Sequence, residues 1–121
     1  MWSLILLLAL QAQPHNEVEW SAYLAEGLGG PTEVRLFDDS RVDILTETYA
    51  IEVDWAKKWP EAIGQSQYYG IITGKEPGVL ILTKDAKADR KYLYRCLIVA
   101  TRLKCKVWAY DTVKGEYIIG K

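Results

Sequence analysis

Apolar and polar residues alternate along two neighbouring segments in the first half of the chain. Arg41–Thr46 and Tyr49–Asp54 both follow this pattern, which is typical of strands with one buried face. A short turn around Glu47 and Thr48 separates them, so the pattern predicts a β-hairpin. The two strands of a hairpin lie side by side, and their side chains can be directed at one point.

Three other segments have apolar residues at every third or fourth position and predict helices. Asn16 is suited to cap a helix that continues through about Leu28, where two glycines and a proline end it. The second helix is predicted over Lys57–Ile72. The third begins after the cap residue Asp85 and continues through about Leu103.

Each of the two later helices has a predicted packing face. In the second helix this face consists of Trp59, Ala62, Ile63 and Ser66. In the third it consists of Leu93, Cys96, Leu97, Ala100 and Leu103. Gly64 lies inside the second helix, where glycine costs about 1 kcal/mol relative to alanine. We therefore expect Gly64 to mark a close approach of this helix to the sheet.

The remaining strands are predicted over Thr32–Phe37, Val79–Thr83, Lys106–Tyr110 and, at an edge, Glu116–Ile119. Val79–Thr83 is almost wholly apolar, as expected at the centre of a sheet. The element order is therefore α-β-β-β-α-β-α-β, with an optional last strand. A hairpin that leads into a helical crossover implies an α/β fold, with a mixed sheet and helices on both faces. The length suffices for one domain, assigned to residues 16–121.

The net charge of −1 conceals two halves of opposite sign. Through Thr83 the chain has twelve acidic and five basic residues, a balance of about −7. From Lys84 onward it has ten basic and four acidic residues, a balance of about +6. Acids suit a metal site, and bases attract a phosphate backbone. Alternatively, a basic helix and an acidic sheet pair with each other within the fold.

The predicted hairpin carries one acid on each strand. Asp43 lies on the first strand and Glu52 on the second. Paired carboxylates on rigid strands suit a hard divalent cation such as Mg²⁺. They could also be ordinary solvent-facing residues, but aspartate is depleted in strands and Glu52 is flanked by Ile51 and Val53.

A row of polar residues on the second helix is aligned with these acids. Lys58, Gln65 and Tyr69 recur at spacings of seven and four, within a stripe about 40° wide. Asp54 joins this stripe if the helix begins early; it is otherwise a third ligand or a helix N-cap. An ammonium beside carboxylates suggests chemistry on a phosphate. Alternatively, Lys58 forms a surface ion pair with Asp54 or Glu61 and has no catalytic role.

The order and spacing of these segments carry a family resemblance. The matching residues are Arg41-Val-Asp-Ile-Leu-Thr46, Ala50-Ile-Glu-Val-Asp-Trp55 and Lys58-Trp-Pro-Glu-Ala-Ile-Gly-Gln-Ser-Gln-Tyr-Tyr69. They resemble the PD-(D/E)XK nuclease superfamily, and in particular its RecB-type branch, which is marked by Gln-x-x-x-Tyr on the helix after the active-site strand. The resemblance extends from about Glu17 to Thr83. It implies a restriction-endonuclease-like α-β-β-β-α-β core and a nuclease that uses Mg²⁺ or Mn²⁺ as its cofactor.

The resemblance also implies a role for each matching acid. Asp43 resembles the first metal-binding acid, and Glu52 resembles the acid of the (D/E)-x-K motif. Glu17, on the preceding helix, resembles an additional acid that many members place there, with Glu19 as the runner-up. The expected metal ligands are therefore Asp43, Glu52 and Glu17.

One position departs from the family pattern. The lysine of the motif is expected where this chain has Asp54. In some members this lysine has moved to the neighbouring helix, and Lys58 is then the natural candidate for the catalytic lysine, with Lys57 second. Gln65 and Tyr69 resemble the pair that supports the site or contacts DNA. If the site is instead degenerate, the fold would serve as a nucleic-acid-binding or protein-binding module.

The expected partner is nucleic acid, with DNA favoured over RNA. Basic residues of the last helix, such as Lys87, Arg90 and Lys91, are candidates to follow its backbone. The oligomeric state stays open between a monomer and a homodimer, although so small a nuclease often needs a second copy to grip a duplex.

Residues 1–12 form an apolar run that is too short to span a bilayer, which takes about 20 residues. The run suits the apolar region of a signal peptide, with Ala12 at a cleavage point. An exported protein without a membrane span in its mature chain is expected, and otherwise a cytoplasmic one. A misread start site, or an apolar segment that docks on the domain, would explain the same run.

The two cysteines permit two interpretations. Cys96 and Cys105 could form a disulfide in an exported protein, or both could be buried free thiols. With a single histidine, His15, and no Cys-x-x-Cys motif, the sequence argues against a zinc site and a histidine-based nucleophile.

Overall fold

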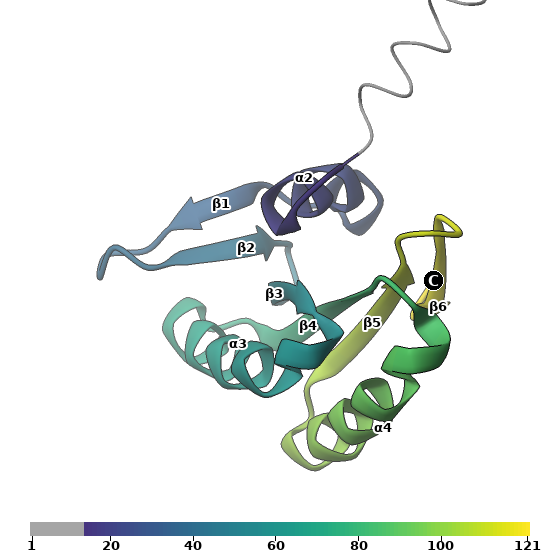
Figure 1. The fold of residues 1–121 in the computed structure, drawn as a ribbon. Coiled ribbons are helices and arrows are strands. Elements are labelled where there is room, and N and C mark those ends of the chain that lie inside the picture. Colours follow the sequence, from purple (N-terminus) through teal and green to yellow (C-terminus); the bar gives the residue numbers. More distant parts are fainter. Residues whose placement is uncertain (1–13) are drawn as a thin grey trace, which may run out of the picture.

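The computed structural model describes residues 14–121, which form a six-stranded mixed sheet with helices on both faces (Figure 1). The strands are β1 (Thr32–Arg35), β2 (Arg41–Leu45), β3 (Tyr49–Trp55), β4 (Glu76–Thr83), β5 (Lys106–Asp111) and β6 (Glu116–Ile119). The helices are α2 (Glu17–Leu28), the 3₁₀ turn η1 (Ala56–Lys58), α3 (Trp59–Thr73) and α4 (Ala86–Leu103).

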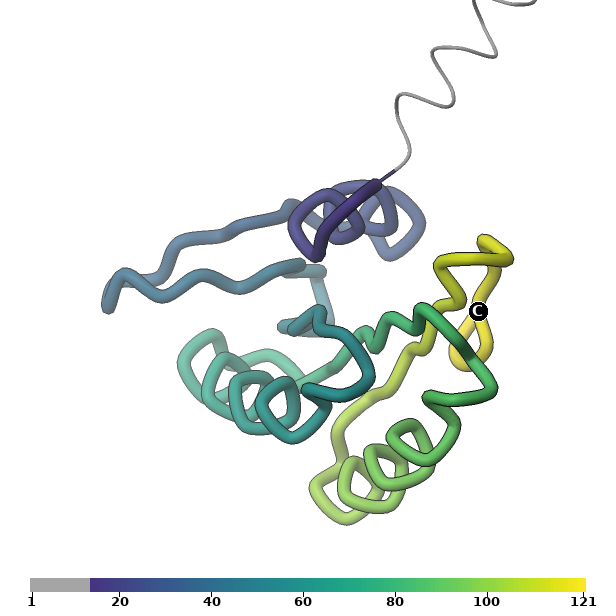
Figure 2. The backbone as a smooth tube through the Cα atoms, viewed as in Figure 1, coloured from purple at the N-terminus to yellow at the C-terminus, as the bar shows by residue number. Residues whose placement is uncertain are grey.

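The strands are ordered β1-β2-β3-β4-β5-β6 across the sheet. The first three are antiparallel, β3, β4 and β5 are parallel, and β6 is antiparallel to β5. Helices α3 and α4 make the two crossovers between parallel strands and lie on one side of the sheet, whereas α2 lies on the other (Figure 2). The predicted α/β class and element order are confirmed.

Alternating strand residues divide the core into two layers. The layer under α2 contains Trp20, Leu24, Ile51, Val53, Leu80 and Leu82. The layer under α3 and α4 contains Ala62, Ile63, Val79, Ile81, Leu93 and Cys96. Burying each of the larger aliphatic side chains contributes about 1.5–3 kcal/mol. These layers fix the faces of β3 and β4, and therefore the direction of each polar side chain on them.

Local sequence signals explain most of the element ends. The Asn16 side chain accepts a hydrogen bond from the amide of Glu19 and begins α2, and Gly29, with φ of 85°, ends it. Asp85 caps α4 in the same way as Asn16 caps α2. Helix α3 begins later than predicted, because Ala56–Lys58 forms a separate 3₁₀ turn before it.

Three packing predictions are wrong. Leu97 and Leu103 are 36% and 42% exposed, because the core contacts of α4 are confined to the narrower stripe that includes Leu93, Cys96 and Ala100. Gly64 is exposed, and a Cβ there would meet nothing within 4 Å. The close approach occurs instead at Gly30, where a Cβ would lie 2.2 Å from the carbonyl oxygen of Leu45.

The two cysteines are buried free thiols and form no disulfide. The sulfur of Cys105 lies 3.5 Å from the hydroxyl of Ser66 on α3. Burial raises the pKa of the Cys96 thiol to about 12, to which the charge of Cys105 also contributes. Both cysteines therefore serve as small core residues of the layer under α3 and α4.

The signal-peptide prediction for residues 1–12 lies outside the described residues. Within residues 14–121, none of the helices has the length and apolar content needed to cross a bilayer.

Candidate functional site

The antiparallel pairing of β2 and β3 places the first two acids at the same level. Ile44 is opposite Ile51 and Leu45 is opposite Ala50, and continuing this register by one residue would set Asp43 beside Glu52. Because Ile44 and Ile51 share one face and side chains alternate along each strand, Asp43 and Glu52 share the other face. The Oδ2 atom of Asp43 accepts a hydrogen bond of 2.8 Å from the amide of Val53, which holds this carboxylate against β3.

Glu52 is the buried member of this pair. It is 6% exposed, and its Oε2 atom is buried without a hydrogen-bond partner. Burial raises the pKa of Glu52 to about 10, helped by a hydrogen bond with Asp43 and by the charges of Asp43 and Asp54. In the absence of a cation, Glu52 therefore holds a proton at neutral pH.

Two more acids lie at the carboxyl end of β3. Asp54 lies on β3, and Glu17 begins α2, which packs on the face of the sheet away from α3 and α4 (Figure 1). Burial raises the pKa of Glu17 to about 7, together with the charge of Asp54 and a hydrogen bond to it. The charge of Asp43 acts on Glu17 in the same direction. Asp43 and Asp54 therefore act on the pKa of both Glu17 and Glu52.

Hydrogen bonds decide two questions that the sequence left open: whether Asp54 caps a helix, and whether Glu17 or Glu19 lies beside the other acids. The Oδ1 atom of Asp54 accepts from the amide of Trp55 at 2.8 Å, and neither η1 nor α3 has a side-chain cap. The prediction of Asp54 as a helix cap is therefore wrong. Glu19 is exposed, and its carboxylate accepts a hydrogen bond from the Asn16 side chain, so Glu17, not Glu19, lies beside the other acids.

Lys58 lies at the junction of η1 and α3, where its side chain is exposed. Its positive charge lowers the pKa of both Glu17 and Asp54, which shows that its ammonium is near them. Because α3 begins at Trp59, Lys58 precedes the helical stripe on which it was predicted. Lys57 is also exposed, and its charge is not among the causes of these shifts.

The alternative for Lys58, a surface ion pair with Asp54 or Glu61, is not observed. Within residues 14–121, one ion pair lies within 4.0 Å, between Arg35 and Asp39. Lys58 therefore has no bonded carboxylate partner in this part of the chain. The alternative in which the basic helix pairs with the acidic sheet is likewise not observed among the described residues.

The two α3 residues of the Gln-x-x-x-Tyr motif have different environments. Tyr69 is 7% exposed and belongs to a small cluster with Val42 and Ala50. Burial raises its pKa to about 12, and the charges of Glu52 and Asp43 act in the same direction. Its ring therefore lies beside the paired acids, whereas Gln65 is exposed on the helix surface.

Nothing in the described residues forms a complete metal-ligand set as it stands, since no three His, Cys, Asp or Glu side chains there are grouped to hold an ion. The Asp43–Glu52 pair still suits a hard divalent cation, on two observations. The Oε2 atom of Glu52 is buried without a partner. The neighbouring charges of Asp43 and Asp54 also disfavour ionisation of Glu52, an effect that a cation would reverse.

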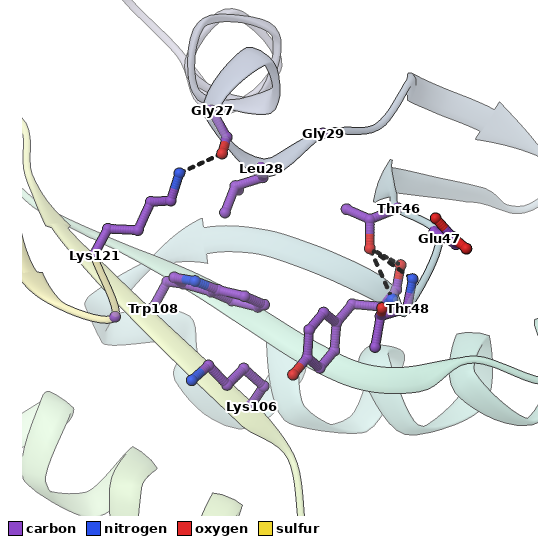
Figure 3. Close-up of a pocket in the computed structure, with 11 residues that line it drawn as sticks. Gly27, Leu28, Gly29, Thr46, Glu47, Thr48, Lys106, Trp108 and Lys121 are labelled. Carbon is purple, nitrogen blue, oxygen red and sulfur yellow. Dashed lines mark hydrogen bonds between the residues drawn. The ribbon is translucent and has the colours of Figure 1, made fainter.

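Two hollows lie at different ends of the sheet. One, of about 330 Å³, is lined by Lys58 and Trp55 at the carboxyl end of β3. The other, of about 440 Å³, is lined by Thr46, Lys106 and Trp108, and none of the predicted site residues borders it (Figure 3). Of the predicted site residues, Lys58 and its runner-up Lys57 line the first hollow, and none of the four candidate acids does.

Sequence reasoning missed one feature of this region. The Nζ atom of Lys84 lies over the ring of Trp55, 4.6 Å from its centroid. Trp55 directly follows Asp54, and Lys84 directly follows β4. The contact could have been predicted from the strand order, because the parallel pairing of β3 and β4 brings their carboxyl ends to one edge of the sheet.

Comparisons of the chain with known protein families, with characterised proteins and with solved structures find no match.

Proposed function

We propose that this chain is a divalent-metal-dependent nuclease that hydrolyses phosphodiester bonds of DNA. The observation that carries the proposal is the pairing of Asp43 with the buried Glu52, whose Oε2 atom has no partner. Glu17, Asp54 and the ammonium of Lys58 adjoin this pair. Mutually interacting carboxylates with perturbed pKa values are typical of functional sites, and Lys58 lines a hollow of about 330 Å³.

The acids would hold Mg²⁺ or Mn²⁺. Asp43 and Glu52 are the first ligands, because their side chains share a face of the hairpin, and Glu17 is the third. When bound, the cation would supply a water of lowered pKa and would polarise the phosphate. Hard cations take oxygen ligands, and these three side chains offer only oxygen.

The other residues would act on the phosphate and on the acids. Lys58 has an exposed ammonium without an ion pair within residues 14–121, so it is free to balance the charge that develops on the phosphate. Tyr69 packs in a small core cluster near the acids and would support their positions. Gln65 is exposed and is therefore assigned to contact with DNA.

A cleavage assay tests this proposal. Purified protein is incubated with plasmid and with linear DNA, with Mg²⁺, with Mn²⁺ and with EDTA. Cleavage is expected only with a divalent cation, and Asp43→Asn and Glu52→Gln should abolish it. Lys58→Met should lower the rate by about 10² or more, whereas the exposed Glu116→Gln is the matched control. Wild-type protein that stays inert with every substrate and metal would overturn the enzyme assignment.

A second candidate function is a nuclease fold that binds nucleic acid without cleaving it. Two observations favour it: the described residues hold no complete three-ligand group, and Asp54 stands where the resemblance implies lysine. Such a protein would bind DNA with affinity that falls with salt but would bind no Mn²⁺. Metal binding that is lost in Asp43→Asn would exclude this candidate.

A further inference from the structure

The carboxyl ends of the three parallel strands form an edge that is rich in lysine. Strand β3 ends at Trp55, β4 at Thr83 and β5 at Asp111. Two hollows, of about 330 Å³ and 390 Å³, open along this edge, and Lys84 and Asp85 line both. The lysines that line one or both hollows are Lys57, Lys58, Lys84, Lys87 and Lys114.

The acids among these lysines are engaged with backbone amides. Asp85 accepts from the amide of Ala88 at 3.1 Å, and Asp89 accepts from that of Lys84 at 3.3 Å. The carboxylate of Asp111 accepts from the amides of two following residues, both at 2.9 Å. Within residues 14–121 none of these acids lies within 4.0 Å of a lysine ammonium. Five lysines and three acids therefore line the two hollows, and the site acids Asp54 and Glu17 adjoin the row only at its Lys58 end.

Trp55 offers an aromatic surface at the start of this edge. One face of its ring is covered by the ammonium of Lys84, at 4.6 Å from the ring centroid. Lys84 is exposed, and a cation over a ring at an exposed position contributes only about 0.5–1 kcal/mol. Lys84 can therefore leave the ring at little cost. Asp54 of the candidate site immediately precedes Trp55 and accepts its amide hydrogen.

We propose that this edge binds one nucleic-acid strand, with phosphates on the lysine row and one base stacked on Trp55 in place of the Lys84 ammonium. The proposal rests on the nuclease function proposed above and specifies its substrate: an unpaired strand or a frayed end. A base can stack on a protein ring only when it is free of its own duplex. The strand would then run from the hollow beside Lys58 towards Lys114.

Binding measured without catalysis tests the proposal. Fluorescence anisotropy of a labelled 12-nucleotide strand, and of the same sequence as a duplex, is recorded in EDTA at several salt concentrations. The wild type should bind the strand more tightly than the duplex. Trp55→Ala should weaken strand binding roughly 5- to 150-fold, and Trp55→Phe should weaken it less, because a ring remains.

Exposed lysines provide variants that leave the core intact. Lys84→Gln and Lys114→Gln should each weaken strand binding and lower the slope of log affinity against log salt by about 0.7. The matched control is Lys106→Gln. Lys106 also lies over a tryptophan ring, 5.7 Å from the centroid of Trp108 (Figure 3), but it begins β5, whereas the lysine-rich edge lies where the parallel strands end. Strand binding by this variant should equal that of the wild type. If Trp55→Ala fails to fold, which thermal melting would reveal, the lysine variants and Trp55→Phe still decide.

Three results would overturn the proposal: equal or tighter binding of the duplex, wild-type strand affinity in both Trp55→Ala and Lys84→Gln, or no binding of the strand at all. Cleavage with Mg²⁺ or Mn²⁺, followed separately, distinguishes this failure from failure of the nuclease function. If the wild type cleaves DNA but Trp55→Ala binds the strand as tightly as the wild type, the proposed strand site is wrong and the nuclease function stands. Binding that depends on Trp55 and Lys84, in a protein that never cleaves, supports the strand site and removes the nuclease function.

Discussion

Replacing Glu52 by glutamine should stabilise the cation-free protein at neutral pH. The native pKa of about 10 lies above the ordinary value of 4.5, so the folded state holds a proton that the unfolded chain releases. The contribution of Glu52 to stability is therefore complete below about pH 4.5 and declines as pH rises towards 10. From pH 4.5 to 7 the decline is about 3 kcal/mol, at about 1.4 kcal/mol for each pH unit. Glutamine has the same shape and cannot ionise.

The assay is urea unfolding in EDTA at pH 5, 6, 7 and 8, followed by tryptophan fluorescence. The wild type should lose stability as pH rises. Glu52→Gln should lessen this dependence and unfold at higher urea at pH 7, and the dependence that is left comes from Glu17, whose pKa burial raises to about 7. Glu116→Gln, an exposed acid on β6, should behave as the wild type. A wild type of constant stability from pH 5 to 8, together with a destabilised Glu52→Gln, would refute the argument that Glu52 is buried as a neutral acid.

Other predictions concern packing. Gly64→Ala should stabilise the protein by about 0.5–1 kcal/mol, because a Cβ at this exposed helical position meets nothing within 4 Å; urea unfolding measures this, and a loss of stability would contradict it. Gly30→Ala should destabilise by more than about 2 kcal/mol, because its Cβ would lie 2.2 Å from the Leu45 carbonyl oxygen; an unchanged urea midpoint would contradict it. Cys96 and Cys105 should resist alkylation at pH 8 in the native protein and react in denaturant, because burial raises the pKa of both thiols; rapid native labelling, read by mass spectrometry, would show that these thiols are exposed.

Much of the fold could be predicted because local signals and tertiary packing agree. The alternation in β2 and β3 identified the hairpin, and Asn16 and Asp85 marked the starts of two helices. Element ends were less predictable. Strand β4 begins at Glu76, before the apolar run, because parallel pairing with β3 extends it through Pro77. A strand end that is set by backbone pairing cannot be predicted from the pattern of apolar and polar side chains.

The candidate site could be predicted only in part. Its hairpin half followed from period-two alternation, which places Asp43 and Glu52 on one face once register is fixed. The approach of Glu17 to Asp54 joins helix α2 to strand β3, two elements far apart in the sequence, so no periodicity within one element encodes it. The same limit applies to Lys84 over Trp55, where the contact depends on two parallel strands ending at one edge.

Titration with Mn²⁺, followed by the loss of the free-ion electron paramagnetic resonance signal, tests most directly whether Asp43 and Glu52 form a cation site. Wild-type protein should bind Mn²⁺ saturably, Asp43→Asn and Glu52→Gln should each weaken binding at least tenfold, and Glu116→Gln should match the wild type. Wild-type protein that leaves the free Mn²⁺ signal unchanged, or variants that bind as well as it does, would contradict the account.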